Sequence, residues 1–123
     1  MNAQIARKLV DAWFAHWAAG TPELLPLAEH FTHTSPYGTI EGKAAYMALV
    51  NANREQFLGN RFEVLDVLAG ANSVCVRYTM HTPTFSMDVS EWFYTSGNTI
   101  ESVLSYYNIE GEIDSDRSLK QPS

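Results

Sequence analysis

The sequence predicts one α+β domain in which helices come first and an antiparallel sheet follows. Helical spacing and helix-boundary residues dominate the first half of the chain, up to about residue 59. From about residue 61 onward, strand-like alternation is interrupted by short turn signals. The length of 123 residues suits a single domain with a real hydrophobic core. Helices that precede a run of antiparallel strands pack on one face of the sheet.

Residues 3–19 predict the first helix, which Gly20 is expected to end. Residues 21–23, Thr-Pro-Glu, look like an N-cap, a proline at the first helical position and an acidic first turn. They predict a short second helix through Leu27, which Pro26 limits in length. The apolar stripe of the first helix is expected to contain Ile5, Leu9, Ala12, Trp13, His16 and Trp17.

Residues 31–42, FTHTSPYGTIEG, form an alternating segment, a Pro-Tyr-Gly turn and a glycine before a further helical stretch. Strand side chains alternate between two faces, so His33, Ser35 and Tyr37 would share one side if the backbone stayed extended through Pro36. Such turns at strand ends often present functional groups. We therefore expect this segment at the rim of any pocket.

The rest of the chain predicts one more helix and then four strands. The third helix is expected after Gly42 and should end near Gly59. The strands are expected at residues 61–68, 73–82, 85–95 and 99–109, with turns at 70–72, 82–84 and 96–98.

Alternation assigns faces to two of these strands. In the second predicted strand, one face carries Val74, Val76, Tyr78 and Met80 and should point to the interior. Arg77 then lies outside, although the opposite register would make it a clamp for a ligand carboxylate. In the third predicted strand, the more apolar face is formed by Met87, Val89, Glu91 and Phe93, opposite Asp88, Ser90, Trp92 and Tyr94.

Composition excludes several classes of protein. Eight basic and fourteen acidic residues give a formal charge of −6 without a basic cluster, so nucleic acid is not an expected partner. The four histidines and the single Cys75 lack the spacing of a zinc site, and Cys75 cannot form an internal disulfide. No window is apolar enough to span a membrane, and the N-terminus lacks the apolar core of a signal peptide. We expect a cytoplasmic protein without a metal or other cofactor.

The order of these elements resembles a known family. Helix, helix and strand, then an xPxG turn at 35–38 and an IxGK motif at 40–43 before a third helix and a curved sheet, are similar to the nuclear transport factor 2-like superfamily. Within it, the chain resembles the SnoaL-like and ketosteroid isomerase-like branch. The resemblance implies a cone-like α+β barrel, with three N-terminal helices packed on a strongly curved, mainly antiparallel sheet. It covers residues 5–112, which implies a domain at 1–112 and a polar, flexible tail at 113–123.

The isomerase pattern carries over only in part. Its general-base aspartate precedes the Pro-x-Gly turn, where this chain has Ser35, which cannot take a proton from carbon without a neighbouring base. Its oxyanion-hole tyrosine corresponds to Trp13, and its second oxyanion partner, a carboxylic acid, corresponds to Glu91. A pocket-lining aromatic residue falls at Tyr107. The resemblance therefore does not imply the steroid isomerase reaction itself.

Glu91 and His33 are the candidate catalytic residues. If Glu91 points into the cone, burial should raise its pKa and allow it to act as an acid, a base or a hydrogen-bond donor. If the register is reversed, Glu91 is an ordinary solvated carboxylate. His33 could replace the missing base, because imidazole titrates near neutrality, or it could only hydrogen-bond a neighbour.

Aromatic side chains are the candidate ligand-binding residues, because tyrosine and tryptophan suit an apolar ligand with one polar group. This favours a small apolar molecule with a carbonyl or hydroxyl. The function is either cofactor-independent acid/base chemistry or non-catalytic binding of a ligand or a protein. Apolar residues on the convex face predict a partner surface, and they are Trp92, Tyr94, Leu104 and Tyr106. Members of the family commonly pair through this face, so the resemblance implies a homodimer. The candidate ligand-binding residues are Trp13, Trp17, Ser35, Tyr37, Tyr46, Tyr78, Phe93 and Tyr107.

Overall fold

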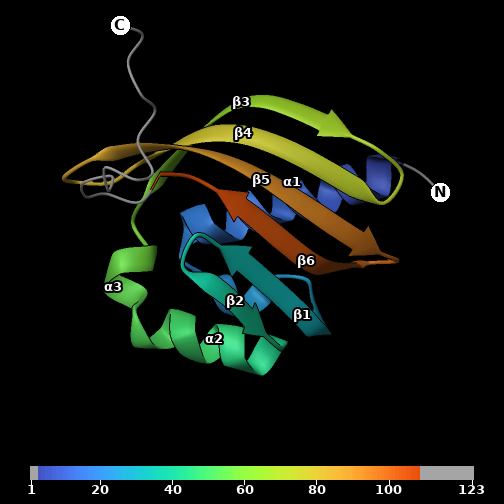
Figure 1. Cartoon of the computed structure of the whole chain (residues 1–123), viewed down its shortest axis with the longest axis horizontal. Coiled ribbons are helices and arrows are strands. Elements are labelled where there is room, and N and C mark those ends of the chain that lie inside the picture. The colour runs from blue at the N-terminus through green and yellow to red at the C-terminus, as the bar shows by residue number, and fades with distance from the viewer. Residues whose placement is uncertain (1–2, 109–123) are drawn as a thin grey trace, which may run out of the picture.

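The computed structural model describes residues 3–108, which form a curled six-stranded sheet with helices against its concave side (Figure 1). The predicted tail at 113–123 and the domain boundary at 112 lie outside the described residues. The elements in chain order are α1 (Ala3–Ala19), the 3-10 helix η1 (Pro22–Leu24), β1 (Leu27–Ser35), β2 (Gly38–Glu41), α2 (Lys43–Ala52), α3 (Arg54–Phe57), β3 (Arg61–Ala69), β4 (Ser73–His81), β5 (Ser86–Ser96) and β6 (Thr99–Tyr106).

The sheet has the strand order β2-β1-β6-β5-β4-β3. Strands β3 to β6 form an antiparallel meander, and β1 joins it by pairing parallel to β6. Because β2 and β3 stay at opposite edges, the sheet is curled but does not close into a barrel. The α+β prediction, with helices on a strongly curved and mainly antiparallel sheet, is confirmed.

The first helix has the predicted bounds but a different buried face. Gly20, with φ of 76°, adopts the left-handed conformation that ends α1. The predicted stripe is wrong at Ile5, which is 40% exposed, whereas Leu9 is partly buried against the core as predicted. The buried residues of α1 are Ala6, Val10, Trp13 and Trp17.

The predicted second helix is only the single 3-10 turn η1, and Leu27 already belongs to β1. Pro26 disfavours helical geometry at the residue before it, and Leu25 is accordingly extended, with φ of −60° and ψ of 135°. Thr21 does not cap the turn through its side chain; its hydroxyl instead lies 3.0 Å from Nδ1 of His16.

The predicted third helix is divided in two. Asn53 leaves helical geometry, with φ of −126° and ψ of 33°, so that α2 ends before it and α3 begins after it. The Asn53 side chain donates a hydrogen bond to the Leu49 carbonyl, at 2.9 Å, and so satisfies one of the last acceptors of α2.

The segment 31–42 folds as a hairpin and not as one extended strand. Ser35 pairs with Gly38, which leaves Pro36 and Tyr37 as the two turn residues. Tyr37 is 75% exposed. The condition that would have placed His33, Ser35 and Tyr37 on one side is therefore not met, because the chain reverses at Pro36.

The predicted faces of β4 and β5 are confirmed. Val74, Val76 and Tyr78 are buried, and so are Val89, Glu91 and Phe93. Arg77 lies on the outer face, where its guanidinium is 2.6 Å from the Asp66 carboxylate, so it does not enter the interior.

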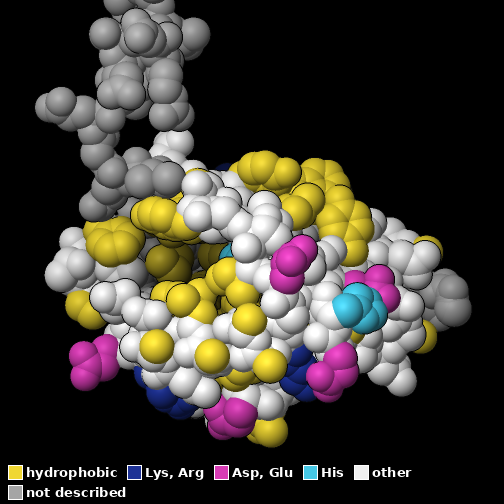
Figure 2. Space-filling view, turned by 60° about the horizontal axis from the view of Figure 1, so that its bottom comes forward, with side chains coloured by type: hydrophobic (Ala, Val, Ile, Leu, Met, Phe, Trp, Pro, Cys, Tyr) yellow, Lys and Arg dark blue, Asp and Glu magenta, His cyan; other side chains and the backbone are white. Residues whose placement is uncertain are grey.

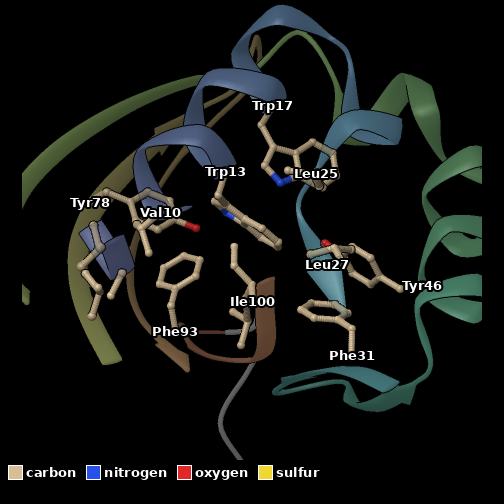
Figure 3. Close-up of a cluster of buried hydrophobic side chains, with 14 of the residues drawn as sticks. Val10, Trp13, Trp17, Leu25, Leu27, Phe31, Tyr46, Tyr78, Phe93 and Ile100 are labelled. Carbon is tan, nitrogen blue, oxygen red and sulfur yellow. The ribbon is translucent and has the colours of Figure 1, made fainter. Parts of the chain in front are cut away.

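An aromatic cluster fills the space between α1 and the sheet. Figure 3 shows Trp13 of α1 directed toward Phe31, Tyr46 and Ile100, and Trp17 beside Leu25. Trp13 meets Phe93 edge to face, with ring centroids 5.4 Å apart, a favoured aromatic geometry. Phe93 and Phe31 have no exposed surface. This cluster forms the floor on which the candidate site is built.

Candidate functional site

A cavity of about 250 Å³ lies between the helices and the concave face of the sheet. Figure 2 shows a hollow with mainly hydrophobic walls opening on this side of the molecule. Its wall is formed by α1, β1, β2, α2, α3 and β3 to β6, with Asn60 and Tyr107 just outside these elements. The volume suits a small molecule and lies just below the usual range of ligand pockets.

Glu91 is the buried carboxyl of this cavity. Its exposed fraction is 4%, and it faces inward because it shares the parity of Val89 and Phe93 on β5. Ser105 lies directly opposite in the register of β5 and β6, and its hydroxyl donates to Oε2 of Glu91 at 2.5 Å. The other oxygen, Oε1, is buried and has no hydrogen-bond partner within residues 3–108. An unpaired buried carboxyl oxygen is costly, which marks Oε1 as a position where a ligand could bind.

Burial raises the pKa of Glu91 from its ordinary value of 4.5 to about 7. The hydroxyls of Ser105 and Tyr78 beside the carboxyl stabilise its ionised form, which lowers this pKa and offsets part of the effect. The Tyr78 hydroxyl affects the carboxyl without meeting the geometry of a hydrogen bond to Oε1. Near neutrality, Glu91 can therefore either donate or accept a proton.

His33 occupies the wall of the cavity as part of an aromatic stack. Its ring centroid is 5.1 Å from that of Tyr46 and 6.5 Å from that of Trp13, with nearly parallel planes. Burial lowers the pKa of His33 from 6.5 to about 4. The expectation that His33 titrates near neutrality is wrong, because the stacked and buried imidazole loses the hydration that stabilises its charged form.

The cavity brings together seven of the ten predicted site residues. Three do not line it, namely Ser35, Tyr37 and Phe93. Phe93 is a core residue beneath the cavity floor, and Ser35 accepts a hydrogen bond from the Tyr37 backbone N–H at 3.2 Å in the turn. The predicted residues that do line the cavity are Trp13, Trp17, His33, Tyr46, Tyr78, Glu91 and Tyr107.

The tyrosines differ in their position. Burial and the neighbouring Glu91 carboxyl raise the pKa of Tyr46 and Tyr78, so both hydroxyls remain protonated. Tyr107 is less buried, and its ring lies 6.2 Å from that of Tyr37. Burial raises the pKa of Tyr107, and hydrogen bonding with Ser35 lowers it. The turn at 36–37 therefore reaches the cavity indirectly, through Tyr107.

Several cavity residues were missed by the sequence analysis. Ser105 is the most consequential, because it holds one oxygen of Glu91. Phe57 and Phe62 also line the cavity, and neither was assigned to the site from the sequence. Met80 was expected on the interior face of its strand but was not assigned to the site. The other lining residues that were not assigned to the site are Ile40, Leu49, Gln56, Asn60, Met87 and Val89.

Two classes of site are not found in the part of the chain that the structure describes. Residues 3–108 contain no group of three or more His, Cys, Asp or Glu side chains placed to hold a metal ion. No helix within the same range is long and apolar enough to cross a bilayer.

Solved structures define the class of fold. A protein of unknown function from Mesorhizobium loti, described as NTF2-like, is similar with a TM-score of 0.74 and 16% identity, covering 86% of this chain and 93% of its own. A structure from Kribbella flavida, provisionally named a ketosteroid isomerase, is similar with a TM-score of 0.73 and 16% identity. The match covers 98% of this chain and 93% of that chain. A SnoaL-like protein of unknown function from Burkholderia thailandensis is similar with a TM-score of 0.71 and 21% identity. The match covers 85% of this chain and 95% of that chain. The fold is therefore NTF2-like.

The sequence itself identifies the branch. Residues 10–102 match the SnoaL-like domain, and the chain belongs to this family. This confirms the resemblance seen in the sequence. No curated protein matches the chain significantly.

Proposed function

We propose that this protein binds a small, mainly apolar molecule carrying a carbonyl or hydroxyl and exchanges a proton with it through Glu91. The observation that carries the proposal is the buried Oε1 of Glu91, which lacks a partner among the described residues and belongs to a cavity-lining side chain. The reaction would be a cofactor-independent isomerisation, cyclisation, dehydration or hydrolysis. Some similar structures carry isomerase names, and this supports the same class of chemistry.

The division of roles follows from the charges of the site. Glu91 is the proton-transfer group, since its pKa of about 7 keeps both forms available. His33 stays neutral and serves as an aromatic wall and hydrogen-bonding group. The hydroxyls of Tyr78 and Tyr107 would orient the polar atom of the ligand.

The experiment that tests catalysis is exchange of the α-hydrogens of cyclohexanone in D2O, followed by proton NMR. The wild-type protein is expected to accelerate exchange, and Glu91→Gln to lose about 10²-fold or more of this acceleration, the usual contribution of a general base. Glu29→Gln changes an exposed carboxylate on β1 and is the matched control, expected to retain activity. Wild-type activity that survives Glu91→Gln would contradict the assignment of the base.

A second candidate, a non-catalytic binding module, is favoured by one specific observation. Ser35 stands where the isomerases have an aspartate, and His33 is a weak base, so Glu91 is the cavity's one proton-exchange group near neutral pH among the described residues. Saturation of the cavity by cyclohexanone without any α-hydrogen exchange would select this candidate.

We also propose that a second copy of the chain covers the outer face of the sheet. Leu68, Cys75, Trp92 and Leu104 align across four neighbouring strands, and Leu68 and Trp92 are 75% and 41% exposed. An apolar row of this kind is typical of an interface. Light scattering should give twice the chain mass of 13.8 kDa, and Trp92→Lys should give the monomer mass. A monomeric wild-type protein at high concentration would contradict this proposal.

A further inference from the structure

We infer that the cavity also binds small hydrophobic amines as cations, with the ammonium group placed against Oε1 of Glu91. This inference rests on the proposed function because it uses the same cavity and the same carboxyl. The two proposals differ in the form of Glu91 that contacts the ligand. A carbonyl or hydroxyl oxygen accepts a proton or a hydrogen bond from the protonated acid, whereas an ammonium group donates a hydrogen bond to the ionised carboxylate.

The first argument is the arrangement of the two carboxyl oxygens. Oε2 already receives the Ser105 hydroxyl, whereas the buried Oε1 has no partner within residues 3–108. An ionised carboxylate is an acceptor only, so its free oxygen requires a donor. A protonated amine supplies that donor together with a compensating charge, and hydrogen bonds between charged groups are the stronger ones.

The second argument is the aromatic wall. The aromatic side chains of Trp13, Tyr46 and Tyr78 line the same cavity as Glu91, and Phe57 and Phe62 extend the wall. Aromatic faces attract organic cations within about 6 Å of the ring, more strongly where water is excluded. A buried carboxylate surrounded by aromatic rings therefore suits an ammonium group on an apolar body.

The third argument is the sign of the charges. None of the cavity-lining residues in the described range 3–108 is lysine or arginine, so an anionic ligand would find no counter-charge. The formal charge of the whole chain, −6, also attracts cations and repels anions. The cavity should therefore discriminate strongly between an amine and a carboxylate of the same size.

The titratable groups around Glu91 make the pH dependence simple. Tyr46 from α2, Tyr78 from β4 and Tyr107 after β6 have raised pKa values, and His33 from β1 has a pKa of about 4. Helix α1 contributes only indole rings to the wall. Between pH 6 and 8, Glu91 is thus the group in this wall that changes charge. Amine binding should strengthen about tenfold over this range, as the ionised fraction of Glu91 rises.

The experiment compares benzylamine, benzyl alcohol and benzoate, which share one ring and differ in charge. Titration calorimetry with the wild-type protein at pH 8 should show benzylamine binding at least tenfold more tightly than benzyl alcohol, with benzoate weakest. Lowering the pH to 6 should weaken the binding of benzylamine about tenfold, although the amine itself stays protonated. Benzyl alcohol should not weaken in parallel.

Variants separate the charge from the shape of the site. Glu91→Gln keeps the size of the side chain and should bring benzylamine down to the affinity of benzyl alcohol, while Glu29→Gln should bind both as the wild type does. If Glu91→Gln does not fold, the pH dependence of the wild type still decides the question.

The outcomes distinguish this inference from the proposed function. Benzyl alcohol binding equal to or tighter than benzylamine at pH 8, or amine binding independent of pH, would overturn the inference and leave the proposed function standing. Absence of cyclohexanone exchange together with retained selectivity for the amine would overturn the proposed function and leave this inference standing. If none of the three probes binds, both are overturned.

Discussion

Replacing Glu91 with glutamine should stabilise the protein at pH 8 by about 3 kcal/mol more than the same substitution does at pH 4. In the unfolded chain the carboxyl ionises above its ordinary pKa of 4.5, but in the folded protein only above about 7. Between these values the folded state binds more protons than the unfolded state. The contribution of Glu91 to stability therefore falls as pH rises from 4.5 to 7, and glutamine has no such dependence.

Chemical denaturation at pH 4, 6 and 8 measures this effect as a difference between variant and wild type. The difference is needed because His33 acts in the opposite direction. Its pKa of about 4 lies below its ordinary 6.5, so its contribution to stability is lost as pH falls from 6.5 to 4. Glu29→Gln should show a curve parallel to the wild type. A parallel curve for Glu91→Gln would mean that Glu91 ionises normally in the folded protein.

Phe93→Ala should lower the free energy of unfolding by about 3–5 kcal/mol, the range for truncating a buried aromatic side chain. Phe93 has no exposed surface and packs against Trp13 and Phe14, with ring centroids 5.4 and 6.1 Å away. Its loss leaves a void that the surrounding rings cannot fill without leaving their favoured geometry.

Urea denaturation of this variant at pH 7 gives the free energy. Leu24→Ala is the control, because Leu24 is 59% exposed on η1, and its truncation should cost less than about 1 kcal/mol. Equal losses in the two variants would show that the Trp13–Phe93 cluster is not a structural centre of the fold.

The inward direction of Glu91 was predictable because β4 and β5 are regular over that region. Strict alternation through Val89 and Phe93 fixes the parity of Glu91, and the pairing of Val76 with Glu91 keeps both on one face. Resemblance to the isomerases indicated the same direction. Alternation alone left the direction of Glu91 open, because the opposite face carries Trp92 and Tyr94, so the resemblance decided the prediction.

The pairing of Ser105 with Glu91 could not be predicted in the same way, because a bulge shifts the register. From the turn at Gly97, simple counting would place Leu104 opposite Glu91. An irregularity after the Thr95–Ile100 pair shifts the register of β6 by one residue, so Ser105 and not Leu104 lies opposite Glu91. The outward face of Leu104 itself was predicted from the sequence. A similar shift between Val64 and Asp66 turns Val67 inward on β3. Alternation carries no information on such one-residue insertions.

Other differences arise from tertiary packing. Ala6 and Val10 are the fully buried residues in the first half of α1, whereas Ile5 is 40% exposed and Leu9 is partly buried. The parallel pairing of β1 with β6 has no local signal, since its partners are about 70 residues apart in the chain. The aromatic stack that neutralises His33 depends on this same pairing and on the packing of α2.

The pairing of β1 with β6 also has a consequence for synthesis of the chain. Thr34 finds its partner Leu104 only after the ribosome has added the intervening 104 − 34 = 70 residues. At about 5–20 residues per second, this takes roughly 4 to 14 seconds. During that interval, β2 and α2 are the neighbours available to β1, and Phe31 and His33 have no completed sheet to face. The wall that holds the site is thus among the last parts of the domain to form.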